Sequence, residues 1–317
     1  MAAGGFSHSP AVLALAGGVG GAKLALGFAR CLPPDDLVIC VNTGDDETFH
    51  GLHVSPDLDT MMYTLSGLSN QETGWGLAGD TFTALEMLRK FGVDTWFNLG
   101  DRDLATHIRR TQLLSEGKSL SEVTSELNRS LGVAHSVTPM SDNPVKTVLA
   151  TDEGELPMQR YFVGRRAEPR VTGVRYVGAD TATSSPGLDK AIAEAGMLVL
   201  CPSNPYLSLG PILALPGVRQ KLRAFPGKKV CVSPIVGGDS VKGPAGKIMA
   251  ELGKQVSCVE IAQEYRDICD VFVMDLQDQS LVSEVEEMDI IPLVTSTIME
   301  TEEDKIALAR EILALAD

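Results

Sequence analysis

The chain has 317 residues and a formal net charge of −15, and 44% of its residues are hydrophobic, 22% charged and 5% aromatic. These figures are typical of a globular enzyme packed with aliphatic side chains, and they exclude extensive disorder. The acidic balance leaves no overall basic field for a nucleic-acid backbone, so an anionic ligand must be bound locally, by backbone amides, a metal ion and a few cations.

The cysteines and the apolar residues indicate the compartment. The six cysteines are scattered without a Cys-x-x-Cys pair, and no secretory leader precedes them. We therefore expect reduced thiols in a cytoplasmic protein. No apolar run approaches the roughly 20 residues of a membrane span. The sequence thus predicts neither a membrane partner nor a nucleic-acid partner.

The N-terminal part of the chain predicts alternating strands and helices. A short apolar run at 11–16 is typical of a buried parallel strand, and it leads into a glycine loop that opens a helix at 22–30. A second buried strand is predicted at 37–41. Its carboxyl end delivers residues 42–47 to the edge where open α/β sheets bind ligands.

The middle of the chain predicts inserted material before the alternation resumes. Helices are expected at 58–65, 82–91, 103–114 and 120–131, the last with Ser119 and Glu122 spaced as a capping box. Strand-like patterns at 145–150, 158–163 and 171–177 predict a local antiparallel piece. Further strands are expected at 197–201, 230–233, 271–274 and 290–294, with helices at 245–252, 261–265 and 304–315.

These elements together predict one α/β domain over residues 1–317. Its fold class is Rossmann-like and doubly wound, with a mostly parallel sheet. The inserted helical and small β subdomain is placed at approximately 58–180.

Four carboxylates follow the glycine loop closely, and together they indicate a metal and a phosphate. Asp45, Asp46, Asp57 and Asp59 offer the hard oxygen ligands that suit Mg²⁺, which usually takes one or two carboxylates. The loop supplies backbone N–H groups for phosphate oxygens, at the positive end of the following helix. Helix caps and solvated turns would explain any single carboxylate. Their clustering favours a shared phosphate and metal site.

The glycine loop differs from the better-known nucleotide motifs. It is not a Walker loop, because Ala22 rather than glycine precedes Lys23. It is not a dinucleotide fingerprint, because Lys23 replaces the third glycine and Asn42 replaces the acid after the second strand. A nicotinamide cofactor is therefore disfavoured. A plain strand-to-helix turn remains an alternative.

Polar residues recur at positions that would face the same edge. Asp103, His107 and Arg110 share one helix face, which could hold a diphosphate or a polyhydroxyl chain, or could be an N-capped face in solvent. Ser203-Asn204-Pro205 follows one predicted strand and Ser233 ends the next. Either segment could be a proline-shaped turn. Their recurrence at successive strand ends favours a site.

Seven ordered blocks resemble the 2-phospho-L-lactate transferase family of coenzyme F420 biosynthesis. They lie at 17–23, 42–46, 56–60, 99–107, 139–142, 202–205 and 233–235. The resemblance implies a Rossmann-like domain with an inserted subdomain, usually assembled as a homodimer. It implies Mg²⁺-dependent transfer of a phospholactyl or phosphoenolpyruvyl group from lactyl- or enolpyruvyl-2-diphospho-5'-guanosine to the ribityl hydroxyl of the deazaflavin Fo. GMP and (dehydro-)F420-0 are the implied products.

The resemblance also assigns roles to residues. Asp45 and Asp57 are the implied candidates for binding Mg²⁺ and the ribityl chain, and they form the expected catalytic set with Asp59. Ser203 and Asn204 are assigned to the guanylyl donor. The whole expected substrate-binding set is Gly17, Gly18, Gly20, Gly21, Lys23, Thr43, Asp46, Asp101, Arg102, Asp103, His107, Arg110, Ser203, Asn204, Pro205 and Ser233.

The chain differs from the family pattern in one block, and its sequence also leaves one alternative function. Met158-Gln159-Arg160-Tyr161-Phe162 replaces the usual Phe-Gln-acid-aromatic-Trp, and the loop Gly-Gly-Val-Gly-Gly is similar to the bacterial branch, which is associated with phosphoenolpyruvyl donors. The alternative is a related family of bacterial regulators that bind nucleotide sugars without turnover. Those proteins share the glycine loop but lack the blocks at 56–60 and 100–103.

Overall fold

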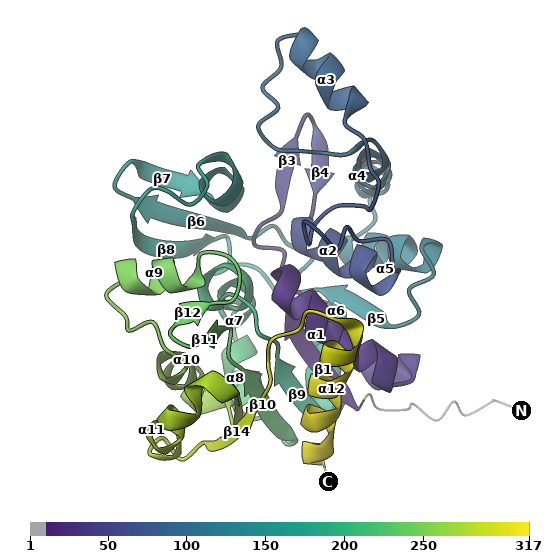
Figure 1. Ribbon diagram of the computed structural model, residues 1–317. Coiled ribbons are helices and arrows are strands. Elements are labelled where there is room, and N and C mark those ends of the chain that lie inside the picture. Colours follow the sequence, from purple (N-terminus) through teal and green to yellow (C-terminus); the bar gives the residue numbers. More distant parts are fainter. Residues whose placement is uncertain (1–10, 317) are drawn as a thin grey trace, which may run out of the picture.

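A seven-stranded parallel sheet forms the centre of the molecule, with helices on both of its faces (Figure 1). The computed structural model describes residues 11–316, so residues 1–10 and 317 of the predicted domain lie outside the described part. The sheet consists of β1 (Val12–Ala16), β2 (Leu37–Val41), β5 (Ser136–Pro139), β9 (Met197–Leu200), β10 (Lys228–Val232), β13 (Val271–Asp275) and β14 (Ile291–Thr295). The predicted α/β fold class is confirmed.

The strand order β14-β13-β10-β9-β1-β2-β5 makes the sheet doubly wound. The chain first moves outward from β1 to β2 and β5, and it then returns to place β9 on the other side of β1. Leu15 of β1 is paired with Cys40 of β2 and with Leu200 of β9. The switch in direction therefore falls between β1 and β9, where such sheets bind ligands at their carboxyl ends.

Alternation along β1 divides the core into two layers. Leu13 and Leu15 face one layer, and Val12, Ala14 and Ala16 face the other. The first layer is covered by α6 (Pro186–Glu194), α7 (Gly210–Leu213), α8 (Val218–Arg223), α10 (Cys258–Tyr265) and α11 (Val282–Glu286). The second is covered by α1 (Gly18–Cys31), α2 (Pro56–Leu65), α4 (Asp101–Ser115), α5 (Leu120–Ser130) and α12 (Glu302–Leu313).

Three further pieces lie outside the central sheet. The β2–β5 connection contains the hairpin β3 (Glu47–Phe49) and β4 (Leu52–Val54), which projects from the body together with α3 (Thr83–Lys90) (Figure 1). The β5–β9 connection forms an antiparallel sheet of β6 (Lys146–Thr151), β7 (Gly154–Pro157) and β8 (Val171–Val177). A small hairpin of β11 (Ile235–Val236) and β12 (Asp239–Ser240) precedes α9 (Ala245–Glu251).

Most predicted elements are present, and the differences have local causes. The strand prediction at 158–163 is wrong, because residues 158–164 are helical and end in a short π-helical turn at 160–164, and the buried Met158 and Tyr161 are three positions apart. The short strand β5, the β3–β4 hairpin and α6 were not predicted. Residues 136–139 fall inside the range 58–180, yet they pair with β2 in the central sheet. Within residues 11–316, no helix is both long and apolar enough to cross a membrane.

Candidate functional site

A cavity of about 460 Å³ opens at the switch point. Its walls come from the glycine loop after β1, the residues after β2, the first turns of α2 and α4, and the loop after β9. Segments near residues 73–76, 158–163 and 241–245 complete its mouth. The cavity thus lies where the strand order predicts a ligand.

The predicted site residues divide into those that line this cavity and those that do not. The lining set is Gly17, Gly18, Gly20, Lys23, Asp45, Asp57, Asp59, Asp103, His107, Ser203, Asn204 and Ser233. The remaining predicted residues, which lie outside the lining, are Gly21, Thr43, Asp46, Asp101, Arg102, Arg110 and Pro205.

Asn42 connects the carboxylates of Asp45 and Asp57. Its Nδ2 donates to Asp45 Oδ1 at 3.2 Å and to Asp57 Oδ2 at 2.9 Å, and its Oδ1 accepts from the backbone N–H of Gly44. Gln159 Nε2 donates to the other oxygen of Asp45 at 3.2 Å. Neutral amides therefore hold two buried carboxylates side by side without supplying a positive charge.

The electrostatics of this pair fit a divalent cation. Burial, followed by repulsion from Asp57 and Asp46, holds the pKa of Asp45 well above its usual range. Burial raises the pKa of Asp57 to about 6, with the Asp46 charge acting in the same direction. A cation between the two carboxylates would remove the repulsion, and oxygen donors are the ligands that Mg²⁺ prefers. The donor set at Asp45 and Asp57 therefore fits Mg²⁺.

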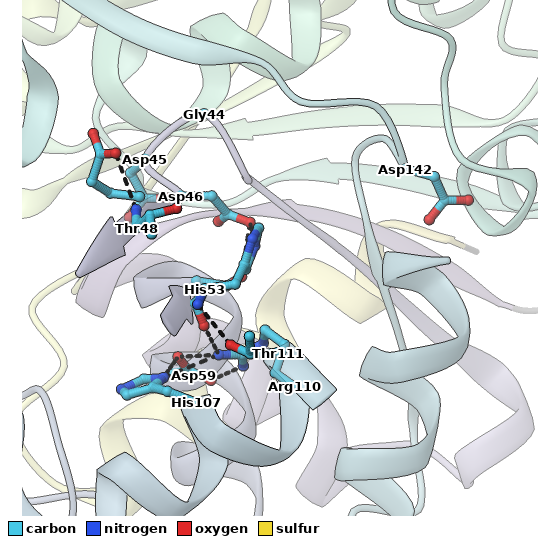
Figure 2. Close-up of polar contacts among 12 residues, drawn as sticks. Gly44, Asp45, Asp46, Thr48, His53, Asp59, His107, Arg110, Thr111 and Asp142 are labelled. Carbon is cyan, nitrogen blue, oxygen red and sulfur yellow. Dashed lines mark hydrogen bonds and ion pairs between the residues drawn. The ribbon is translucent and has the colours of Figure 1, made fainter. Parts of the chain in front are cut away.

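Asp46 faces away from the cavity and has its own partners. Its Oδ2 lies 2.9 Å from His53 Nε2 and accepts from Ser55 Oγ at 2.8 Å. Figure 2 shows Asp46 directed toward His53, at the base of the hairpin β3–β4. Asp46 therefore contributes charge to the site, while its Oδ2 holds the entry to α2.

Arg110 organises a second group of polar side chains below the cavity. Figure 2 shows its guanidinium between Asp59 and His107. It donates to both oxygens of Asp59, at 3.1 Å to Oδ2, and lies 3.2 Å from His107 Nδ1. Because a guanidinium only donates, Nδ1 must accept, and a neutral imidazole then carries its proton on Nε2. That nitrogen lies 3.2 Å from Asp103 Oδ2, and Tyr63 donates to Asp103 Oδ1.

This group is a poorer metal site than the Asp45 and Asp57 pair. Ligand atoms of Asp59, Asp103 and His107 do lie within 4.8 Å of one another. A metal on His107 Nε2, however, would require the proton on Nδ1, directly against the N–H of Arg110. The guanidinium already supplies the positive charge next to Asp59. We therefore interpret this group as a hydrogen-bonded frame that fixes the two carboxylates facing the cavity.

The glycine loop brings the N-terminus of α1 against the loop after β9. The hydroxyl of Ser203 donates to the carbonyl of Gly17 at 2.9 Å, and the backbone N–H of Gly17 donates back at 3.2 Å. The first turn of α1 contains no acidic residue, and its Ncap Gly17 provides no side-chain cap. The helix start nevertheless attracts an anionic group, because the backbone of Gly18 hydrogen-bonds to the carboxylate of Asp57.

We expect Gly20→Ala to lower the melting temperature strongly. A Cβ at Gly20 would lie 2.3 Å from the carbonyl oxygen of Pro202, a backbone atom that cannot move without shifting β9. A matched variant is Gly18→Ala, where the nearest atom would be 3.8 Å away and only the positive φ of +62° opposes the change, at about 1 kcal/mol. Thermal unfolding of both variants measures the difference. Equal melting temperatures would contradict this packing role.

Several predicted site residues have structural partners instead of cavity contacts. Asp101 accepts from the backbone N–H groups of Thr83 and Ala84 and from the Thr81 hydroxyl, and these hydrogen bonds lower its pKa to about 2. Arg102 donates to the carbonyl of Ala78. These contacts fix the start of α3 and the loop before it.

The other predicted residues outside the lining are also accounted for by packing. A Cβ at Gly21 would meet Ser203 Oγ at 2.6 Å, so glycine is needed for the close approach of α1. Thr43 is buried, and Pro205 starts the turn after β9. Asn204 lines the cavity, while its Oδ1 caps that turn by accepting from the N–H groups of Tyr206 and Leu207.

Some residues of the cavity were not found from the sequence. Asn42 and Gln159 hold the carboxylates, and Trp75 and Phe162 line the mouth. Asn42 carried a usable signal, because it ends β2 directly before the carboxylates. The others come from distant loops, which only the tertiary fold brings to the cavity.

The fold and the cavity define an α/β protein with a cavity at the switch point of a parallel sheet, where paired carboxylates lie beside a helix N-terminus. The model of the 2-phospho-L-lactate transferase CofD family matches residues 12–310. The chain belongs to this family and is a transferase.

Two relatives and one solved structure illustrate the similarity. A phosphoenolpyruvate transferase of Kitasatospora aureofaciens is 41% identical over 313 residues, covering 96% of this chain and 98% of the relative. A 2-phospho-L-lactate transferase of Methanosarcina mazei is 40% identical, covering 85% and 88%. A crystal structure of a UPF0052 family protein from Bacillus halodurans has a TM-score of 0.62 at 16% identity, covering 96% and 99%. The resemblance seen in the sequence is confirmed, and the last comparison supports the fold alone.

Proposed function

We propose that the protein transfers a phospholactyl or phosphoenolpyruvyl group from lactyl- or enolpyruvyl-2-diphospho-5'-guanosine to the ribityl hydroxyl of the deazaflavin Fo. The observation that carries this proposal is the buried Asp45 and Asp57 pair beside the N-terminus of α1, an arrangement suited to a metal-bound diphosphate. Names of relatives at about 40% identity support the transferred group. The products are (dehydro-)F420-0 and GMP.

The residues at the switch point account for the chemistry of such a transfer. Mg²⁺, held by Asp45 and Asp57, would neutralise the charge of the diphosphate. The amides at the start of α1 bind phosphate oxygens, and Lys23 adds a positive charge on the same side. The ribityl oxygen attacks in line, its bond to phosphorus forms, and the bond from phosphorus to the GMP oxygen breaks. The hydroxyl proton passes to a carboxylate of the cavity. We assign this role to Asp59, which Arg110 holds in place.

The mouth of the cavity suits a flat, largely apolar acceptor. Trp75, Phe97, Phe162 and Val163 line it, and Trp75 and Phe162 are 46% and 38% exposed. Aromatic side chains stack on planar ring systems. We propose that the Fo ring lies against these residues and that its ribityl chain extends toward Asp59 and Asp103.

One experiment tests the proposed function directly. The protein is incubated with Fo, Mg²⁺ and each of the two guanylyl donors, and the deazaflavin product is identified by mass. We expect product with at least one donor, together with release of GMP. Micromolar binding of a UDP-sugar without any response to Fo would instead assign the regulator function.

We further propose a homodimer in the cytoplasm. An apolar patch is exposed on and beside α3, with Phe82 39%, Met87 43% and Phe91 73% exposed. Apolar patches of this kind commonly mark protein interfaces. All six cysteines are free, as expected in a reducing compartment. Light scattering after gel filtration should give twice the monomer mass, and Phe91→Glu should reduce it; a monomeric wild type would contradict the dimer.

Binding of Mg²⁺ is expected to weaken as the pH falls below about 6. The pKa of Asp57 is raised to about 6, so below that pH a proton increasingly occupies the carboxylate that the metal requires. The apparent Kd for Mg²⁺ should rise about tenfold per pH unit there. Calorimetric titration with MgCl₂ from pH 5 to pH 8 measures this. Asp57→Asn should weaken Mg²⁺ binding and reduce the dependence, because only the buried Asp45 would then still exchange a proton for the metal. A pH-independent Kd in the wild type would contradict the assignment.

A further inference from the structure

Two lysines of the cavity have only neutral partners. Lys23 donates to the carbonyl of Met299 at 2.5 Å, and Lys242 donates to the carbonyl of Thr73 at 2.9 Å. Among residues 11–316, neither forms an ion pair within 4.0 Å of a carboxylate, although the chain carries a net charge of −15. Burial lowers the pKa of Lys23, and the charges of Lys305 and Lys242 lower it further. The like charges of Lys23 and Lys242 thus both face the cavity, and the acidic side chains near Lys23, Glu300 and Asp304, act on it only from beyond ion-pair distance.

Lys242 also connects two loops across the mouth of the cavity. It belongs to the loop after β12, whereas Thr73 belongs to the loop between α2 and α3. The fit is close, because a Cβ at Gly74 would lie 2.7 Å from the Lys242 ammonium and 3.2 Å from Val19 of the glycine loop. The contact therefore lies directly above the segment that we assign to the phosphates.

The loop that carries Lys242 is rich in glycine. Gly237, Gly238 and Gly243 all have positive φ, and Val241 between them is 56% exposed. The N-terminal end of this loop is held by a hydrogen bond that the N–H of Gly237 donates to Asp278 at 3.1 Å. The Lys242 hydrogen bond to Thr73 joins this loop to the facing loop. A carbonyl is a weaker partner for an ammonium than an anionic oxygen.

We propose that Lys242 is an anion-binding residue of the donor site, which exchanges the Thr73 carbonyl for an anionic oxygen of the donor and so closes the 237–244 loop over it. This inference rests on the proposed function. The anionic oxygen belongs to the diphosphate or to the carboxylate of the three-carbon acid. An anion at this point also offsets the repulsion among Lys23, Lys242 and Lys305.

Binding measurements separate the two sources of the anionic oxygen. GDP carries the diphosphate without the acid, and enolpyruvyl-2-diphospho-5'-guanosine carries both. We expect Lys242→Met to raise the Kd for the full donor at least tenfold and Lys242→Arg to retain most of the affinity. An equal loss for GDP assigns the diphosphate, whereas unchanged GDP binding assigns the carboxylate. Lys228→Met is the control, because Lys228 is exposed at the opposite end of β10.

Trp75 reports the closure independently of turnover. It lies two residues from Thr73, and the chain contains only one other tryptophan, so Trp75→Phe identifies its share of the fluorescence. Donor binding should change the Trp75 emission in the wild type and in Lys228→Met but not in Lys242→Met. Wild-type affinity and emission change in Lys242→Met would overturn the role of Lys242 alone. A wild type that binds neither GDP nor the donor would overturn the proposed function, and this inference with it.

Discussion

Asp45→Asn and Asp57→Asn are each expected to lower kcat at least ~10²-fold, because each removes a charged ligand of the metal that clamps the diphosphate. Asp57→Asn should at the same time leave the metal-free protein as stable as the wild type or more stable. Asp57 is buried and carries a raised pKa, so its charge destabilises the metal-free fold, and an asparagine keeps an oxygen for the Nδ2 of Asn42. Steady-state kinetics at several Mg²⁺ concentrations and urea unfolding in EDTA measure the two effects.

The effect on stability should distinguish a metal site from a structural one. Asp45→Asn should be tolerated less well than Asp57→Asn, because the oxygens of Asp45 accept hydrogen bonds from both Asn42 and Gln159. An asparagine there would place its amide against one of these donors. Asp289→Asn serves as the control, since that side chain is 96% exposed and distant from the cavity lining. Full activity of either site variant, or of the wild type in excess chelator, would rule out the metal assignment.

Sequence patterns predicted best the elements that are buried along their whole length. Strands such as β1 and β13 are buried along their full length, so continuous apolar runs predicted them. Elements whose form depends on distant partners were missed. β5 has only four residues and an exposed first position, and its pairing with β2 makes it a strand. Residues 160–164 follow β-type composition locally but turn because Tyr161 is buried beneath the antiparallel sheet.

The candidate site shows the same division. The carboxylates and the glycine loop were placed at one edge because the carboxyl ends of parallel strands must meet there. Sequence spacing also put Asp103, His107 and Arg110 on one helix face, but it left open whether that face meets solvent. In the structure His107 and Arg110 are 1% and 2% exposed, so this helix face belongs to an internal network and does not meet solvent. The partner Gln159 comes from a segment far along the chain, and no local pattern marks it as a partner of Asp45.

Arg110→Met is expected to destabilise the protein by about 3–5 kcal/mol, because it leaves the buried carboxylate of Asp59 without a counter-charge. The adjacent Arg109→Met is a matched control. Arg109 pairs with Glu126 at 2.6 Å, but its side chain is 44% exposed, so its loss should cost at most about 1 kcal/mol. Urea unfolding of the two variants gives the comparison.

A second substitution then identifies the cause of the loss. If the cost arises from the uncompensated charge of Asp59, Asp59→Asn should recover much of the stability in the Arg110→Met background, although Asp59→Asn alone removes an ion pair. Loss of packing around the guanidinium would instead make the two effects add. Equal unfolding free energies for Arg110→Met and Arg109→Met would show that the network below the cavity does not depend on this charge, and the orientation of His107 would then need another explanation.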